Sequence, residues 1–191
     1  MPLDNKFKAI LEYLKDPGSH HHTGDKLICY LTFDSSQCLE VKRKLPGWLS
    51  LTKGFGYNFS TLSMTTVLND FFINEPSRDV WLNMVPNIED GQEAIYDFYK
   101  SDLGSLITEN KVIEKAILKI NNVLSKEINP LLIITDLEAI HPFTRFGPVE
   151  QNIYTEINIP LIILYPGTIT GSSLEFLGFY PQDGNYRSKH F

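Results

Sequence analysis

The sequence has few features that would favour binding to nucleic acid or to a membrane. Its 23 acidic side chains outnumber 17 basic ones, giving a net charge of -6, so it lacks the overall basic character that neutralises phosphates. The densest basic run, Lys42-Arg43-Lys44, is typical of the solvated side of a helix. No apolar run approaches the ~20 residues that span a bilayer, and no signal peptide is visible. We therefore expect a cytoplasmic protein without direct nucleic-acid or membrane contact.

Cysteine is scarce, and the spacing of the metal-ligating side chains is unfavourable. Cys29 and Cys38 do not form a CxxC pair, which excludes the usual zinc and thioredoxin motifs. Cys29 lies in an apolar run and is predicted to be a small core residue, while a disulfide between the two cysteines stays open. Histidines 20–22 are adjacent in a polar loop, and adjacent loop residues cannot easily all face one ion. We predict neither a metal site nor a cofactor.

The apolar pattern predicts an α/β fold. Runs at 26–33, 131–136 and 159–165 are nearly continuous, as in strands buried on both faces, and shorter strands are predicted at 58–63 and 174–180. Apolar residues at helical spacing predict helices over 3–15, 35–45, 64–73, 92–107, 110–126 and 149–156. The alternation indicates one domain, 1–191, with a mostly parallel sheet of about five strands and helices on both faces.

Local sequence motifs predict both ends of the second helix, whereas one later segment has no clear secondary-structure pattern. Ser35 or Ser36 is predicted to cap the second helix together with Glu40, and Pro46-Gly47 is predicted to end that helix. Segment 75–91 is broken by proline and glycine and shows no clear period. The aromatic and aliphatic side chains of this segment suggest that it packs against the rest of the chain.

The predicted sheet resembles those of Rossmann and P-loop proteins but lacks their phosphate-binding loops. The first strand is followed by Asp34-Ser35-Ser36-Gln37, which has neither the glycines nor the lysine of a P-loop. The run from Gly54 to Phe59 has two of the three glycines of a dinucleotide fingerprint and precedes a strand instead of following one. The run from Gly167 to Ser173 has no lysine and leads into a strand.

Polar residues follow the predicted strand at 131–136. Asp136, Glu138 and His141 lie where open α/β sheets bind ligands, so a nucleotide-binding or hydrolytic enzyme using them is the alternative function. The simpler interpretation of Asp136 is a cap on a loop amide. No G-x-S-x-G elbow is present to supply a hydrolase nucleophile. Arg145 and Arg187 are candidates for carboxylate binding or interface anchoring, with surface ion pairs as the alternative.

The last third of the chain holds the most distinctive pattern. A strand at 159–165 leads into Tyr165-Pro166-Gly167, and Leu174 begins a second strand. Here Pro166 would fix φ and Gly167 would allow a positive φ, so the triplet predicts a strand end feeding a turn. This segment offers no lysine, nucleophile or metal ligand.

Four segments together resemble the BrxB family, small proteins of bacteriophage exclusion (BREX) systems. They are Pro142-Phe143-Thr144-Arg145, 159–167, Leu174 with 176–178, and Asn185-Tyr186-Arg187. The resemblance covers nearly the whole chain, and the Tyr-Pro-Gly motif with its following leucine and aromatic-glycine pair is its most specific part. Family members often end in a Tyr-Tyr-Arg-Ala-Phe-like segment, of which 184–191 keeps one tyrosine and the arginine.

The resemblance implies a BREX component without an established enzymatic activity. Such a protein is expected to act as an adaptor for the PglZ-type phosphatase-superfamily protein, with the large BrxC-type ATPase as a second candidate partner. Its motifs supply the family-motif or interface residues Pro142, Arg145, Tyr165, Pro166, Gly167, Leu174, Tyr186 and Arg187. Independently, the residue patterns contain no complete catalytic set.

Overall fold

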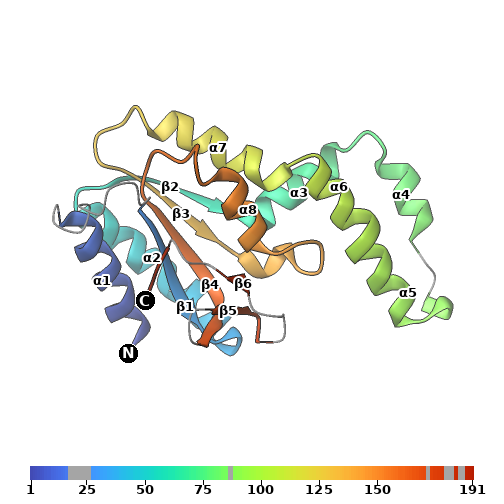
Figure 1. The fold of residues 1–191 in the computed structure, drawn as a ribbon, viewed down its shortest axis with the longest axis horizontal. Helices are drawn as coiled ribbons and strands as arrows, with labels where there is room; N and C mark the ends of the chain where they lie inside the picture. Colours follow the sequence, from blue (N-terminus) through green and yellow to red (C-terminus); the bar gives the residue numbers. More distant parts are fainter. Residues whose placement is uncertain (17–26, 86–87, 171–172, 179–182, 185–187) are drawn as a thin grey trace.

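A computed structural model shows a central sheet with helices on both faces and a helical projection to one side (Figure 1). The structure describes residues 1–16, 27–85, 88–170, 173–178, 183–184 and 188–191. The predicted histidine loop at 20–22, and the candidate residues Tyr186 and Arg187, lie outside the described residues.

Parallel strands form the sheet, which confirms the predicted α/β class. They are β1 (Ile28–Phe33), β2 (Asn58–Ser63), β3 (Pro130–Thr135), β4 (Leu161–Thr170) and β7 (Lys189–His190). Their order is β2-β3-β4-β1-β7, and every neighbouring pair in this path is parallel. The short strand β7 was not expected from the sequence, because two residues carry no periodicity.

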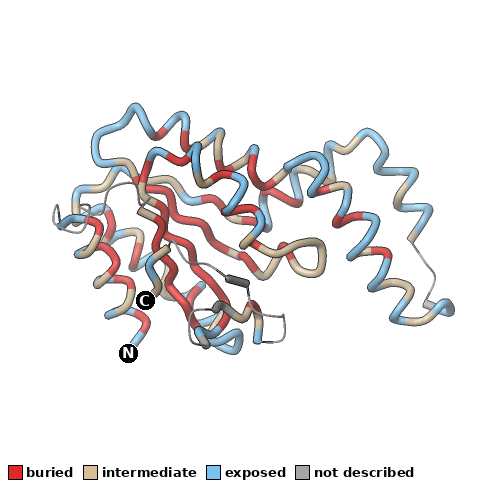
Figure 2. Tube along the Cα trace, in the orientation of Figure 1, coloured by how far each residue is buried: buried red, intermediate tan, exposed pale blue. Residues whose placement is uncertain are grey.

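The helices divide between the two faces, as predicted. On one face lie α1 (Leu3–Lys15) and α2 (Cys38–Gly54), and on the other lie α3 (Met64–Asn74), α7 (Val112–Leu124) and α8 (Phe146–Ile153). Strand β1 sends Cys29 and Leu31 to the first face and Ile28 and Tyr30 to the second. Right-handed crossovers require this division, since β1 to β2 moves one way across the sheet and β2 to β3 to β4 moves back. Figure 2 shows the buried residues concentrated in the strands and on the inward sides of these helices.

The prediction that Pro46-Gly47 ends the second helix is wrong. Helix α2 continues to Gly54, and the residues beyond the proline include the buried Trp48 and Thr52. The ring of Trp48 stacks on Phe7 of α1 with centroids 4.8 Å apart. An interior proline costs about 3 kcal/mol, which the burial of a stacked aromatic side chain can offset.

The predicted cap of this helix is also wrong in detail. Asp34, not Ser35 or Ser36, is the capping residue, and it precedes the short helix η2 (Ser35–Gln37). Its carboxylate accepts from the Ser36 N–H at 2.9 Å, and the Gln37 side chain completes the capping box where Glu40 was expected. A side-chain cap is present as predicted, but the capping residue lies one position earlier in the chain than expected.

The Tyr-Pro-Gly triplet does not form the predicted turn. Strand β4 runs through Tyr165, Pro166 and Gly167 to Thr170, then pairs antiparallel with β5 (Ser173–Phe176), which in turn pairs with β6 (Asp183–Gly184). Proline is tolerated because pairing with β3 ends at Ile163, so β4 has lost one parallel neighbour by that point. The predicted last strand is therefore shorter than 174–180 and antiparallel to its neighbour.

The residues from Glu75 to Glu109 project from the body, and we call them the arm (Figure 1). The arm contains α4 (Arg78–Met84), η3 (Ile88–Asp90), α5 (Gln92–Asp97), the π-helical η4 (Phe98–Leu103) and α6 (Gly104–Glu109). The last three confirm the helix predicted over 92–107, while α4 and η3 occupy the segment without a clear period. In the described part of the chain, no helix has the length and apolar character needed to cross a bilayer.

The cysteines are both free, so the disulfide that the sequence left open is not formed. Cys29 is buried in β1, as predicted. Burial raises the pKa of its thiol to about 12, against a small opposing effect of Lys189. Cys29 is therefore an inert core residue.

Candidate functional site

Asp136 and Glu138 meet a lysine at the carboxyl edge of the sheet. Lys42 Nζ, on α2, lies 3.1 Å from Asp136 Oδ1 and 2.8 Å from Glu138 Oε1. The other Asp136 oxygen accepts hydrogen bonds from Ser63 Oγ at 2.6 Å and Thr135 Oγ1 at 2.9 Å. The expectation of a cap on a loop amide is thus wrong, because the Asp136 side chain makes no capping bond to the described η5 (Leu137–Ile140) and takes side-chain hydrogens instead.

These contacts favour the charged forms of Asp136 and Lys42. Burial acts most strongly on Asp136 and would raise its pKa, but hydrogen bonds from Ser63, Thr135 and Lys42 together lower the pKa below 3.8. The hydrogen bond to Glu138 is the main cause of the raised pKa of Lys42, helped by Asp136 and opposed by burial. Within the described residues, no group of three or more His, Cys, Asp or Glu side chains is placed to hold a metal ion.

Replacing Lys42 with methionine tests this arrangement. We expect the pKa of Asp136 to rise, because burial would then meet less opposition, and we expect a loss of less than about 1 kcal/mol in unfolding free energy at pH 7, because the lysine is half exposed. A lowered carboxyl pKa stabilises the fold fully above the unfolded value of 3.8, and this contribution is lost as pH falls from there through the lower pKa of the folded state. An NMR titration of Asp136 and urea unfolding at pH 7 and pH 3 would measure both effects. Lys53→Met on the same helix is the control, and an unchanged Asp136 titration would contradict the assignment.

His141 lies at the other end of η5 and contacts the arm. Its ring is 6.5 Å from the ring of Tyr96, and burial lowers its pKa. The next aromatic residue, Phe143, lies 5.5 Å from Phe72 of α3 and 6.2 Å from Tyr99 of the arm, measured between ring centroids. The segment 141–145 is therefore the base on which the arm packs, whereas Asp136 and Glu138 are tied to Lys42 on the opposite face.

Glycine is required where the arm meets this base. A Cβ on the buried Gly104 of α6 would lie 2.6 Å from the main-chain oxygen of Phe143. Pro142 follows His141 through a cis peptide bond, and Arg145 precedes the first residue of α8. The candidate residues Pro142 and Arg145 thus belong to the loop that anchors the arm.

A cleft of about 490 Å³ opens at the carboxyl ends of β1 and β4. Asp34 and Gly167 line it from the strand ends, and α1 and α2 form its sides. Open α/β sheets bind ligands outside the carboxyl ends of their strands, where this cleft lies. The sequence did not indicate this cleft, because most of its charged residues lie on helices that are far apart in the chain.

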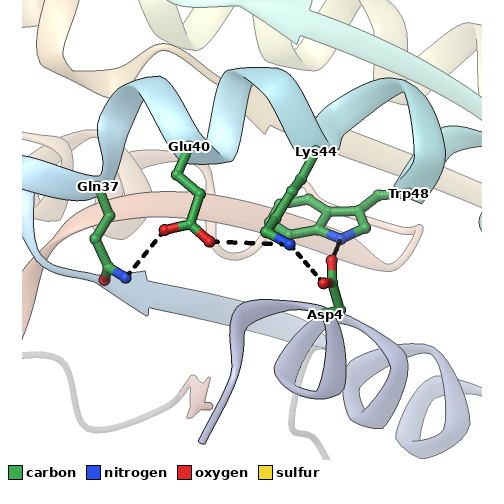
Figure 3. A network of polar contacts seen from close by, with 5 residues as sticks. All are labelled: Asp4, Gln37, Glu40, Lys44 and Trp48. Atoms are coloured by element: carbon green, nitrogen blue, oxygen red, sulfur yellow. Dashed lines mark hydrogen bonds and ion pairs between the residues drawn. The ribbon is translucent and has the colours of Figure 1, made fainter.

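The charged groups of the cleft pair with one another (Figure 3). Lys44 Nζ lies 2.6 Å from Asp4 Oδ2 and 3.8 Å from Glu40 Oε1, and Trp48 Nε1 donates to Asp4 at 2.7 Å. The bonds from Lys44 and Trp48 hold the pKa of Asp4 below its usual range. On the other side, Lys6 Nζ donates to the main-chain oxygens of Thr32 at 2.9 Å and Phe191 at 3.1 Å. These contacts join α1 to α2 and to the last residues of the chain.

The candidate residues in β4 and β5 are structural in their placement. Tyr165 is buried and packs against Tyr30 and Phe176, each with ring centroids 5.4 Å apart. Pro166 pairs with Phe33 in the sheet, Gly167 pairs with Phe176, and Leu174 lies in β5 opposite Ile169. Next to the undescribed Tyr186 and Arg187, Ser188 donates a hydrogen bond to the buried Glu150, which also accepts one from Tyr30.

The surface of the arm combines exposed apolar side chains with a negative net charge. Val80, Leu82 and Met84 of α4 are 62%, 45% and 60% exposed, and neither α4 nor α5 has a buried residue. Between Glu75 and Glu109 the sequence has eight acidic and two basic side chains, a net charge of -6, which equals the net charge of the whole chain. The remaining residues are therefore neutral overall, and the arm is both acidic and apolar.

The family model described as BREX protein BrxB matches residues 64–191, about two-thirds of the chain. The chain belongs to the BrxB family. It is therefore a component of a BREX phage-defence system, as the resemblance implied. No curated protein and no solved structure matched the chain.

Some features of this BrxB family member lie inside the region that the family model matches, and others lie before it. The matched region begins at Met64, the first residue of α3, and includes the arm, the anchoring loop 141–145 and the β4–β5 pair. Asp136 and Glu138 lie inside it, but their partner Lys42 and the residues of α1 lie before it.

Proposed function

We propose that this BrxB family member is a non-catalytic adaptor that works in the cytoplasm by binding other BREX proteins. The PglZ-type protein is the first candidate partner, and the BrxC-type ATPase is the second. The observation that supports this proposal is the acidic surface of the arm with its exposed apolar side chains on α4. The carboxylates at the sheet edge add support, because they are engaged by Lys42 and by hydroxyl groups.

The structure of α4 gives the physical argument. A helix of seven residues is too short to be stable by itself in water. Only the half-buried Trp81 of α4 packs on the body, with its ring 5.5 Å from Phe72, and no residue of α4 is fully buried. Val80 and Met84 are four residues apart and therefore share one side of the helix. An exposed apolar surface of this kind marks a site of protein interaction, so a partner that covers it would stabilise α4.

The charge of the arm indicates the chemistry of the partner. Acidic side chains accompany the apolar ones along α4, η3 and α5, including Asp79, Glu89, Asp90, Glu93 and Asp97. A basic surface with apolar residues would be complementary to the arm in both respects. Because such charges accelerate association and are screened by salt, the complex should form more slowly at high ionic strength.

Co-purification from the BREX operon tests the proposal. We expect the tagged chain to recover a partner protein, and a Val80→Glu/Met84→Glu variant to recover about tenfold less, because both changes place charge in a desolvated contact. Ile128→Glu is the matched control, since Ile128 is 83% exposed and lies outside the arm. Recovery of the wild-type chain without any enriched partner would refute the adaptor function, and equal recovery by the arm variant would refute the role of the arm.

A further inference from the structure

A second surface, between α3 and α7, has the opposite charge. A groove of about 580 Å³ runs between these helices beside Leu62 of β2, and we call it the α3–α7 groove. Strand β2 is the outermost strand on this side of the described sheet, so the groove lies along the edge of the body. Its volume is in the range of sites that bind ligands or side chains of a partner.

Two parallel rows of side chains on α7 define the character of the groove. Val112, Ala116 and Ile120 are half-buried and line the groove at intervals of four residues. Lys115 and Lys119 line it beside them with the same interval, and both are exposed. Among the described residues, neither lysine has an ion-pair partner.

The wall formed by α3 has the same helical spacing. Val67 and Phe71 face the groove four residues apart, with the exposed Thr66 and Asp70 at its rim. The groove is thus bounded by two helical ridges over an apolar floor. Such a surface suits a third helix, whose side chains fit between the ridges of its neighbours.

We propose that the α3–α7 groove binds an amphipathic helix of another protein, with acidic side chains beside its apolar face. Apolar residues at helical spacing would cover Val112, Ala116 and Ile120, and glutamate or aspartate along one edge would pair with Lys115 and Lys119. This is the helix-in-groove mode of recognition, in which anchor residues recur at i, i+3, i+4 and i+7. The lysines would select against a basic helix by like-charge repulsion.

This site goes beyond the proposed function, because the arm alone could bind one partner. An adaptor that joins two proteins needs two separate surfaces, and here they differ in charge: the arm is acidic, and the wall of the groove on α7 is basic. The difference in charge would keep the two partners from exchanging places. The inference rests on the adaptor proposal only in taking the occupant to be another protein of the same system.

Charge reversal with co-purification tests the groove in the full chain. We expect Lys115→Glu/Lys119→Glu to lower the recovery of one partner about tenfold or more, since like charges across an interface are unfavourable by well over 1.4 kcal/mol. Both lysines are exposed, so the fold should be kept, and thermal unfolding would verify this. Ala116→Glu is a second variant, which places a charge in the apolar row of α7 and leaves both lysines unchanged. Lys126→Glu, at an exposed position beyond the end of α7, is the control.

Carbodiimide cross-linking identifies the occupant by its chemistry, because the reagent joins lysine amines directly to carboxylates. We expect Lys115 or Lys119 to be joined to an acidic residue in a segment with apolar residues at helical spacing. Cross-links to a segment without that pattern, or full recovery of every partner by both groove variants, would overturn the inference. If the wild-type chain recovers partners while the groove variants recover them equally, only this inference fails. If the wild-type chain recovers none, the adaptor function fails with it.

Discussion

A Gly167→Ala variant should lose about 2–4 kcal/mol of unfolding free energy, the largest stability effect that we expect from a single methyl group in this protein. A Cβ at this position would lie 2.2 Å from the main-chain oxygen of Glu175 and 2.7 Å from Cε1 of Tyr165. Neither neighbour can move easily, because Glu175 lies in the paired strand β5 and the Tyr165 ring is buried. In a chain of 191 residues this loss corresponds to a fall of roughly 5–12 °C in Tm.

Thermal unfolding would measure this effect, and Gly47→Ala supplies a matched control. Gly47 lies inside α2, and a Cβ there would meet no atom within 4 Å. Alanine in an exposed helix interior is favoured over glycine by about 0.5–1 kcal/mol, so this variant should be slightly more stable than the wild type. Equal Tm values for the two variants would show that the β4–β5 contact is not rigid.

This prediction depends on a feature that the sequence indicated only in part. The Tyr-Pro-Gly triplet marked an unusual point in the chain, and proline followed by glycine is the usual signal for a turn. That signal depends on the backbone alone. A turn signal gives no information about β5, which folds back against β4. Gly167 is therefore needed for the close approach of this neighbouring strand and not for a positive φ.

The parallel core could be predicted because its signal is local and strong. Runs such as 131–136 are apolar without interruption, and the structure buries Leu131 to Ile134 completely, as expected of strands covered on both sides. The end of α2 could not be predicted in the same way, because the reason for continuing beyond Pro46 is a contact with Phe7, almost forty residues earlier. Local propensity was overruled there by tertiary packing.

The same distinction applies to the candidate sites. The sequence placed Asp136 and Glu138 at a strand end, but it could not pair them with Lys42, which local charge patterning assigned to a solvated helix face. The groove had a signal that could have been found: Lys115 and Lys119 follow the apolar row of α7 at a spacing of four. Helix α4 had none, because it is too short to show a period and none of its residues is fully buried.

The anchoring loop connects the family motif to the proposed function. Segment 142–145 belongs to the BrxB pattern, and in the structure it contacts the arm through Phe143 and the close approach at Gly104. Through this contact, the loop would set the position of a partner bound to the arm relative to the body. We therefore propose that this segment fixes the arm relative to the sheet.

A Phe143→Ala variant should release the arm while leaving the sheet folded. Removing the ring deletes its contacts with Phe72 and Tyr99. Because Phe143 is only half-buried, the loss should be smaller than the roughly 3–5 kcal/mol of a fully buried phenylalanine. The arm itself has few buried residues, so its local stability should fall most. Hydrogen exchange would show this as faster exchange in α5 and α6 with unchanged protection in β3 and β4.

The functional consequence of Phe143→Ala separates a positioning role from a general loss of stability. If the arm must be held in place to bind, recovery of its partner should fall about tenfold, as in the Val80→Glu/Met84→Glu variant, while a partner bound in the α3–α7 groove should be recovered normally. Phe143→Leu, which keeps most of the apolar volume, should restore recovery largely. If Phe143→Ala instead raises exchange in β3 and β4 as much as in α5 and α6, the loop is part of the global core, and the arm does not behave as a separately anchored element.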